Sequence, residues 1–534
     1  ERGKPVADLD LVAEHAVSRG GGGPALAVLL GPASEVGRAV LARRSDLALA
    51  VLDRWRSALP PGSVAVEVVC HRGPEQGLAG LWHAARMLSL ARAAGVPAVL
   101  TNAVRYATPD GAVTVDVLDA ARRLVPLDLR HVDRVSAEGS LTSPAYMRRL
   151  AGDVATAAGE GGDGADRLLA DTADLAGRCR LDPGSDLELG STHLPELQVL
   201  GLGASADADA VLRAHCEAGI GRRHPGAAPS TVNVILDRLA AELDAIARLG
   251  YAAYFLTLEQ VCGLIRDLGV RVAARGSGAG SLVNHLLGIS GVDPIRYDLL
   301  MERFLPPRPG RIPDVDLDVE SARRTEVYQA IIDRFGADRV ACVAMTETYR
   351  VRHAIRDVGA ALGLPPAEIS AIATAFPHIR ARDVRRAVGE LPELRSSGLA
   401  APALDLLFDL VERLDGLPRH AAMHPCGLLL SDLSLHDRTP VENTLSGFPM
   451  SQFDKDDVED LGLLKLDLLG VRMQSAMAYA LTEIARVDGP DVARAGGHPP
   501  DAPYLDRETG RIELDGIPHD DETTFRSKIG RAHV

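Results

Sequence analysis

The chain has 534 residues and a mass of 56.5 kDa, enough for three or four domains. Apolar residues make up 46% and charged residues 25%, a composition that excludes a wholly disordered chain. The formal net charge of −15 argues against a protein that coats nucleic acid indiscriminately, because such proteins are basic. No apolar run approaches the roughly 18 residues that span a bilayer, and the six scattered cysteines form no CxxC pair. We expect a cytoplasmic protein with no membrane segment, disulfide framework or zinc module.

The N-terminal quarter of the chain alternates short β-rich runs with helical stretches rich in Ala, Leu and Arg. This alternation predicts an α/β layer over residues 1–135. Two polar segments with glycine, 159–164 and 182–190, are expected to be linkers. The β-rich runs are 25–30, 64–69 and 98–101.

The apolar spacing turns helical after the second linker. Ser230 is expected to cap a helix, because its hydroxyl can accept a hydrogen bond from the first turn. Gly250 is expected to end that helix, and a second helix is expected to run from Tyr254 to Leu268.

A glycine- and serine-rich segment, VRVAARGSGAGS at 270–281, follows these helices. A short strand enters the loop and a helix is expected to leave it. Gly276 and Gly280 let the backbone approach a polyphosphate, and the next helix offers unpaired N–H groups to it. Possible side-chain donors are Arg275, Ser277 and Ser281. No lysine follows the last glycine, so this is not a Walker A loop, and a plain tight turn is the alternative.

The segment IPDVDLDV, at 312–319, carries three alternating aspartates. On a strand, Asp314, Asp316 and Asp318 share one face, where their charges repel one another. Divalent cations relieve such repulsion, and carboxylate oxygens suit Mg²⁺. The alternative is an edge strand with a solvated acidic face.

The segment GLLKLDLLG, at 462–470, places Lys465 and Asp467 on one face of an otherwise apolar strand. The alternative is an internal ion pair with no further role. Lys465 gains weight because the chain has 54 arginines and only four lysines. A lysine kept in such a chain suggests a point charge beside a phosphate.

These three segments together predict two-metal nucleotidyl transfer. The strand of alternating aspartates and the distant single aspartate would hold two metal ions, one at the attacking 3′-hydroxyl and one at the triphosphate. The glycine- and serine-rich loop would bind the phosphates. No separate base is required, because metal coordination can activate the nucleophile.

The chain resembles the bacterial C-family DNA polymerases, the family of the DNA polymerase III α subunit, from about residue 212 to 481. The motifs occur in family order: RLAAELDAIARLGYAAYFL, ARGSGAGSLVNHLLGI, DPIRYDLLMERFL, IPDVDLDVE, AIRDVGAALGL and LGLLKLDLLGVR. The resemblance implies catalytic roles for Asp314, Asp316 and Asp467. It also implies a triphosphate site at Arg275, Gly276, Ser277 and Lys465, with Asp318 as a lesser helper. Primer-template DNA and deoxynucleoside triphosphates are the implied partners.

The same resemblance implies a multidomain α/β fold whose palm is related to the polymerase β-type nucleotidyltransferases. Its thumb arginines, in HIRARDVRR at 378–386, would contact duplex phosphates, and a solvated helix face is the alternative. We expect no metal at His420 and His424, because Cys426 has no second thiol nearby. The expected domains are the end of a PHP-like (polymerase and histidinol phosphatase) region with a linker (1–180), palm (181–345), thumb (346–424), palm (425–473) and the start of helical fingers (474–534).

Two departures from the replicative pattern are visible. MTETYRVRHAIRDVG, at 345–359, is more similar to the error-prone, damage-inducible second α-type polymerase of actinobacteria and their relatives. In the PHP-like region the metal-binding TND-x-HY reads TNAVRY, with Ala103 and Arg105 in place of an acid and an imidazole. We therefore expect neither phosphoesterase nor proofreading activity.

Both ends of the chain look cut. The chain does not begin with Met, and its last six residues, IGRAHV, resemble a translated sequencing adapter. We expect a fragment of a longer polymerase whose sliding-clamp and accessory-factor regions lie beyond it. The alternatives are a PHP-type metallophosphoesterase and a non-catalytic DNA-binding scaffold in a repair assembly.

Overall fold

The computed structural model describes residues 6–17, 23–74, 77–305, 312–395 and 402–488, with Ile512 and Leu514. The chain divides into two compact units, and each is assembled from two separate stretches of sequence. Unit 1 comprises Glu1–Leu181 and Glu347–His420, and unit 2 comprises Asp182–Thr346 and Ala421–Val534. The expected adapter-derived residues at the C-terminus lie outside the described residues.

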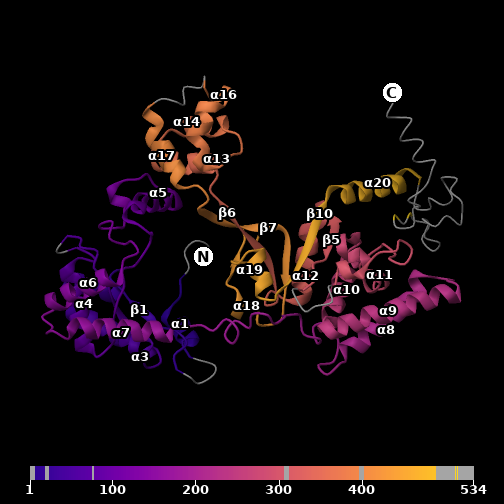
Figure 1. Cartoon of the computed structure of the whole chain (residues 1–534), viewed down its shortest axis with the longest axis horizontal. Helices are drawn as coiled ribbons and strands as arrows, with labels where there is room; N and C mark the ends of the chain where they lie inside the picture. Colours follow the sequence, from indigo (N-terminus) through magenta and orange to yellow (C-terminus); the bar gives the residue numbers. More distant parts are fainter. Residues whose placement is uncertain are drawn as a thin grey trace. The chain divides into compact units, whose positions relative to one another are not determined.

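Unit 1 contains the α/β layer that the N-terminal pattern predicts. Three parallel strands, β1 (Val28–Leu30), β2 (Val64–Val68) and β3 (Ala98–Leu100), pair in that order within the described residues. Parallel neighbours need crossover connections, and helices provide them here. Figure 1 shows these helices, in indigo and purple, gathered around β1. They are α1 (Leu9–His15), α2 (Glu35–Leu41), α3 (Ser45–Ala58), α4 (Leu81–Ala94), α6 (Pro144–Ala157) and α7 (Gly164–Arg178).

A second core in unit 1 is wholly helical. Helix α5 (Ala112–Arg123) contributes Val117 and Ala120 to it, beside Phe376 and Phe408 from the later stretch of sequence. The backbone N–H of Leu127 also donates to the carbonyl of Ala361, at 2.7 Å. The segment expected to form the thumb therefore shares its core with a helix from the N-terminal region. Its own helices are α13 (Val351–Ala361), α14 (Pro366–Ala375), α15 (Val384–Glu390), α16 (Pro392–Arg395) and α17 (Asp405–Arg413).

Unit 2 is built on one mixed sheet. Among the described residues its strand order is β4-β5-β10-β7-β6-β9-β8, and β5 runs parallel to β10 but antiparallel to β4. Strands β5, β10 and β7 are seen side by side in Figure 1. The strands are β4 (Val272–Arg275), β5 (Asp316–Glu320), β6 (Val340–Thr348), β7 (Pro418–Leu430), β8 (Val441–Asn443), β9 (Pro449–Ser451) and β10 (Leu464–Val471).

Helices cover the apolar face of this sheet. Val315, Leu317 and Val319 are buried in a core that includes Tyr254 and Phe255 of α10. Alternation along β5 therefore turns its aspartates to the opposite face. The helices of unit 2 are α8 (Ala208–Arg223), α9 (Pro229–Leu249), α10 (Ala252–Asp267), α11 (Leu282–Leu286), α12 (Arg324–Phe335), α18 (Leu435–Arg438), α19 (Lys455–Asp460) and α20 (Arg472–Asp488). No helix in the described ranges is long and apolar enough to cross a membrane.

The start of α9 differs from the expectation. Ala228 is the N-cap residue, Pro229 occupies the first turn, and no side chain caps the helix. Ser230 lies inside the helix, because the fixed φ of Pro229 already suits a first helical position. The expected end is confirmed, since Gly250 closes α9 in the left-handed conformation with φ +73°.

Candidate active site on the central strands of unit 2

Sheet register brings the predicted aspartates together. Asp316 of β5 lies opposite Asp467 of β10 on one side and opposite Arg275 of β4 on the other. Strand β5 is therefore an interior strand, so the alternative of an edge strand is wrong. Gly427 of β7 completes the row beyond Asp467.

Three carboxylates form a compact cluster on this face. One oxygen each from Asp314, Asp316 and Asp467 lies within 4.8 Å of the other two. Asp314 stands just before β5, which begins at Asp316. The exposed fraction falls from 49% for the Asp314 side chain to 37% for Asp316 and 15% for Asp467. The cluster thus has an open side at Asp314 and a buried side at Asp467.

Lys465 lies against two of these carboxylates. Its Nζ is 2.9 Å from Oδ2 of Asp467 and 3.3 Å from Oδ2 of Asp314, and only 9% of the side chain is exposed. The ion pair of the alternative interpretation is therefore present. However, the buried Oδ1 of Asp467 accepts no hydrogen bond from the protein. A carboxylate that serves structure alone would normally have both oxygens satisfied.

The carboxylates of the cluster repel one another. Burial raises the pKa of the Asp314 carboxyl even though half of the side chain is exposed, and Asp467 and Asp316 add to the rise while Lys465 opposes it. Burial alone would lower the pKa of the Lys465 ammonium, but its hydrogen bond to Asp467 and the charge of Asp314 raise it overall. The lysine therefore stays charged, and it offsets only part of the negative charge around it.

Arg275 bridges the aspartates of β5. Its Nε lies 3.5 Å from Oδ2 of Asp316 and 3.3 Å from Oδ1 of Asp318. Burial raises the pKa of Asp318, and Arg275 limits the rise. Asp318 faces the same side as Asp316 but is not a member of the cluster of possible metal ligands. This placement suits its lower rank as a helper.

The first half of the glycine- and serine-rich loop is well placed to face the cluster. After β4 the chain makes a 3₁₀ turn over Gly276–Gly280. Gly276 has φ +71°, which favours glycine, and a Cβ there would lie 3.8 Å from Oδ2 of Asp316. Gly276 is exposed and Ser277 is half-buried. Both are therefore accessible beside the carboxylates.

The second half of the loop does not match the expectation. The N–H groups of Leu282 and Val283 donate to the buried carboxylate of Glu242, at 3.0 and 3.2 Å, and so does the hydroxyl of Ser281, at 3.0 Å. Ser281 is fully buried, and a Cβ on Gly280 would meet the carbonyl oxygen of Leu300 at 2.6 Å. The expected free helix N-terminus is therefore wrong: Glu242 already occupies it, and Ser281 and Gly280 support the loop from inside.

Glu242 is the functional residue that sequence reasoning missed. It lies on α9, and Arg238 one turn earlier donates to its Oε1 at 2.7 Å and to the carbonyl of Gly280 at 3.1 Å. A signal for it existed. Glu242 falls on the apolar face of the predicted helix between Leu239 and Leu243, where an unpaired acid would be unfavourable.

The cluster fits a divalent cation of the Mg²⁺ class. All its donors are carboxylate oxygens, the ligands that hard cations prefer. The orphaned Oδ1 of Asp467 and the raised pKa of Asp314 both show negative charge that the protein itself does not balance. Asp314, Asp316 and Asp467 are the residues that could hold it.

Comparison with known proteins places this geometry in a family. Residues 210–470 match the family described as "Bacterial DNA polymerase III alpha NTPase domain". That match contains the carboxylate cluster, Arg275, the glycine- and serine-rich loop and Lys465. Residues 210–470 of the chain belong to the bacterial DNA polymerase III α family.

Several relatives of the chain carry the same name. The chain is 33% identical over 467 residues to "Error-prone DNA polymerase" of Pseudomonas fluorescens, covering 87% of this chain and 42% of that protein. It is 34% identical over 401 residues to the protein of that name from Symbiobacterium thermophilum, covering 75% and 35%. A third, from Pseudomonas aeruginosa, is 36% identical over 351 residues, covering 66% and 33%. The chain thus spans about two fifths or less of each relative.

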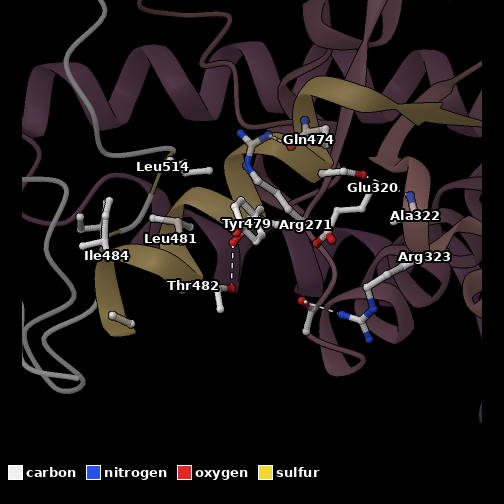
Figure 2. Close-up of a pocket in the computed structure, with 15 residues that line it drawn as sticks. Arg271, Glu320, Ala322, Arg323, Gln474, Tyr479, Leu481, Thr482, Ile484 and Leu514 are labelled. Atoms are coloured by element: carbon white, nitrogen blue, oxygen red, sulfur yellow. Dashed lines mark hydrogen bonds between the residues drawn. The ribbon is translucent and has the colours of Figure 1, made fainter. Parts of the chain in front are cut away.

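A large cavity in unit 2 lies away from the carboxylates. It has a volume of about 740 Å³ and lies between α20 and the end of β5. Figure 2 shows Arg271 reaching Gln474 of α20, with Glu320 and Arg323 on the β5 side of the cavity. The cavity offers a single carboxylate, from Glu320, so it is a weaker candidate for metal chemistry than the cluster.

Unit 1 has a cavity of its own, of about 480 Å³, lined in part by the TNAVRY segment. Arg105 donates to both oxygens of Asp119, at 2.8 and 3.0 Å, and Arg134 donates to both oxygens of Asp116. The ring of His71 hydrogen-bonds to the backbone carbonyl of Asn102. Within the described part of unit 1, no group of three potential metal ligands comes together.

The arginines expected to contact DNA phosphates are paired within unit 1. Arg380 donates to Asp415 at 2.9 Å, and Arg385 donates to Asp405 at 2.8 Å. The side chains of Arg382 and Arg386 are 65% and 64% exposed, so they are the more available cations of this segment. DNA contact by these residues stays a prediction.

His424 lies on strand β7. Its Nδ1 accepts from the backbone N–H of Gly427 at 2.9 Å, and His420 Nε2 lies 3.4 Å from Glu347. Neither histidine belongs to a group of potential metal ligands in the described residues.

Proposed function

We propose that this chain carries the catalytic centre of a template-directed DNA polymerase of the error-prone α type, which joins a deoxynucleoside triphosphate to a primer 3′-hydroxyl. The observation that carries the proposal is the cluster of Asp314, Asp316 and Asp467, with an unsatisfied buried oxygen and a lysine against it. The names of the relatives support the same activity. Because the chain spans only part of those proteins, the proposal concerns the longer natural protein.

In this proposal Asp314, Asp316 and Asp467 hold two Mg²⁺ ions. When bound, these ions would lower the pKa of the attacking hydroxyl and stabilise the charge that develops on the transferred phosphoryl group. The protein's part is to hold three carboxylates together despite their repulsion. The rigid sheet register of β5 and β10 does this.

The cations around the cluster have a second role in this proposal. Lys465 and Arg275 neutralise carboxylates in the described structure, and a bound triphosphate would offer both a richer anionic partner. Gly276 and Ser277 lie beside Asp316 and would let the backbone approach the phosphates. Glu242 would keep this loop in place from behind.

The proposed domain assignment follows the same order as the expectation. Residues 1–180 are PHP-like, 181–345 and 425–473 form the palm, 346–424 the thumb, and 474–534 begin the fingers. Primer-template DNA and deoxynucleoside triphosphates are the proposed substrates. Contacts with a sliding clamp and accessory factors, and a cytoplasmic location, are part of the same proposal.

Primer extension by the longer natural protein tests the proposal. We expect Mg²⁺-dependent extension of a primed template that is lost in Asp316→Asn and in Asp467→Asn, while both variants still retard the primer-template in a gel. Asp333→Asn is the matched control, because Asp333 is an exposed aspartate of α12 in the same unit. Full extension by both active-site variants would overturn the site assignment, and loss of extension in Asp333→Asn would show that the assay reports folding.

A further inference from the structure

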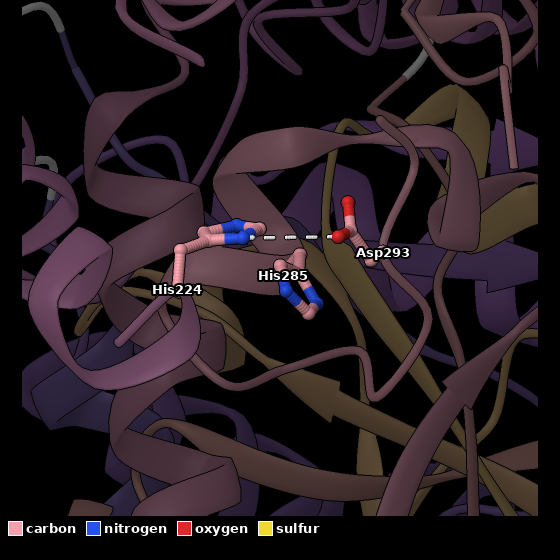
Figure 3. Close-up of side chains that lie close together, drawn as sticks. All are labelled: His224, His285 and Asp293. Atoms are coloured by element: carbon pink, nitrogen blue, oxygen red, sulfur yellow. Dashed lines mark ion pairs between the residues drawn. The ribbon is translucent and has the colours of Figure 1, made fainter. Parts of the chain in front are cut away.

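A second group of potential metal ligands lies in unit 2, outside the carboxylate cluster. His224 follows the last turn of α8, His285 lies on α11, and Asp293 lies in the turn beyond it. One donor atom from each lies within 4.8 Å of the other two. Figure 3 shows the three side chains converging, with His224 and Asp293 on either side of His285.

The histidines are buried without hydrogen-bond partners. His285 is 5% exposed, and neither of its ring nitrogens makes a hydrogen bond of good geometry within the described residues, although the backbone of Ser290 lies close by. The side chain of His224 is 10% exposed, and its Nε2 is also without a partner. A buried polar group without a partner costs about 1–3 kcal/mol, so these nitrogens call for a ligand.

Backbone hydrogen bonds fix the carboxylate of Asp293 next to the histidines. Its Oδ1 accepts from the backbone N–H groups of Ile295 and Arg296, at 2.9 and 3.3 Å. Its Oδ2 lies 3.8 Å from Nδ1 of His224, beyond hydrogen-bond distance. The rings of His224 and His285 are tilted by 59° with centroids 5.4 Å apart, so they are not stacked face to face. The three groups therefore approach a common point without satisfying one another.

Charge around the group also matters. Arg223 and Asp293 both act electrostatically on His285, with opposite signs. Arg223 opposes a cation at this point, and the carboxylate of Asp293 offsets it.

We propose that His224, His285 and Asp293 bind a transition-metal ion of the Zn²⁺ class. Two imidazole nitrogens and one carboxylate oxygen match the donor types that Zn²⁺ takes in proteins, and imidazole disfavours Mg²⁺. Three protein ligands leave a fourth tetrahedral position for solvent. The ion would join the end of α8, helix α11 and the turn at Asp293, close in sequence to the glycine- and serine-rich loop. The proposal does not depend on polymerase activity, because its readouts are metal content and stability.

Metal binding by the longer natural protein tests the proposal directly. After dialysis against Zn²⁺, elemental analysis should find one tightly held zinc per chain in the native protein and in Asp467→Asn. Zinc affinity should fall at least about tenfold in His224→Gln and in Asp293→Asn, the loss that even an outer-shell change brings. His215→Gln is the matched control, since it breaks an exposed histidine–carboxylate contact of 2.7 Å to Glu259 elsewhere in the unit.

A spectroscopic probe separates this site from the all-oxygen cluster. Co²⁺ in a tetrahedral site with nitrogen ligands should give intense visible absorption, which Asp293→Asn should remove and Asp467→Asn should keep. Circular dichroism establishes whether each variant is folded. If His224→Gln does not fold, Asp293→Asn still tests the proposal, because its side-chain oxygen can accept the same hydrogen bonds from Ile295 and Arg296. Absence of bound zinc and of cobalt absorption in the native protein would mean that the group holds only water, and would overturn the proposal. Zinc binding unchanged in His224→Gln and Asp293→Asn would overturn it equally.

Discussion

Carboxylates are treated in opposite ways at the two candidate sites of this molecule. In unit 1, Arg105 lines the cavity and donates two hydrogen bonds to Asp119, which does not line it; these bonds hold the pKa of the Asp119 carboxyl below its usual range. At the cluster of unit 2, burial raises the pKa of Asp314, and the buried Oδ1 of Asp467 has no partner. One region balances its acids internally, and the other leaves negative charge unbalanced.

This difference separates a structural acid from a functional one. A bidentate guanidinium gives both oxygens of a carboxylate a charged partner, so the acid needs no ligand to balance its charge. Crowded carboxylates with raised pKa values destabilise the folded state. Proteins keep such groups mainly at functional sites, where a bound ligand compensates for the repulsion. The comparison therefore supports placing the proposed nucleotidyl transfer at the cluster of unit 2.

The largest expected effect is on catalysis. Asp467→Asn should lower the single-nucleotide incorporation rate of the longer natural protein by about 10³-fold or more, because it removes an anionic metal ligand. Asp119→Asn should leave that rate within about twofold. Rapid-quench kinetics measure both rates. An equal loss in the two variants would erase the distinction between the regions.

The next effect is on stability, at a satisfied carboxylate inside unit 2. Glu242→Ala should lower the free energy of unfolding by about 3 kcal/mol, because it strands Arg238 and the N–H groups of Leu282 and Val283. Urea unfolding followed by circular dichroism measures the change. Glu217→Ala, at an exposed glutamate of α8, serves as control and should change it by less than about 0.5 kcal/mol. A change at Glu242 no larger than at Glu217 would contradict the supporting role.

A smaller effect is expected at the lysine. Lys465→Met should raise the KM for deoxynucleoside triphosphate about tenfold more than it lowers kcat, because it removes a charge proposed to meet phosphate. Steady-state kinetics at saturating primer-template measure the split. Lys455→Met removes an exposed lysine of α19 and should change neither constant. A pure stability loss in Lys465→Met, with unchanged KM, would favour the purely structural ion pair.

The smallest effect is a pair of opposite shifts in melting temperature. Folding raises the pKa of Asp314, so its ionised form destabilises the metal-free protein at pH 7. This destabilisation decreases as the pH falls toward the raised pKa, because the carboxyl becomes protonated. The pKa of Asp119 is lowered, so its contribution is present above about pH 4 and is lost only as pH falls through the lowered pKa.

Asp314→Asn should therefore raise the melting temperature by about 2 °C at pH 7, and by less at pH 5. Asp119→Asn should lower it by a similar amount at both pH values. Differential scanning fluorimetry in metal-free buffer measures both variants. Shifts of the same sign would show that the two carboxylates are not held in opposite ways.

Much of the fold and half of the site could be predicted from the sequence. Alternation in 312–319 and 462–470 located both strands of the cluster and identified the face that carries Asp316 and Lys465. Local patterns also located the three strands of unit 1 and the end of α9 at Gly250. These strands and this helix end depend on residues close together in sequence, so they can be predicted from the sequence alone.

Contacts between distant residues were decided only by the tertiary structure. The register that sets Asp316 against Asp467, the capture of the loop by Glu242, and the sharing of a core between α5 and α13 join residues far apart in sequence. The meeting of His224 with His285 is of the same kind. Residue type and spacing determined which side chains could do chemistry. Packing determined which of them are satisfied and which are left open, because a hydrogen-bond partner is chosen by position in space.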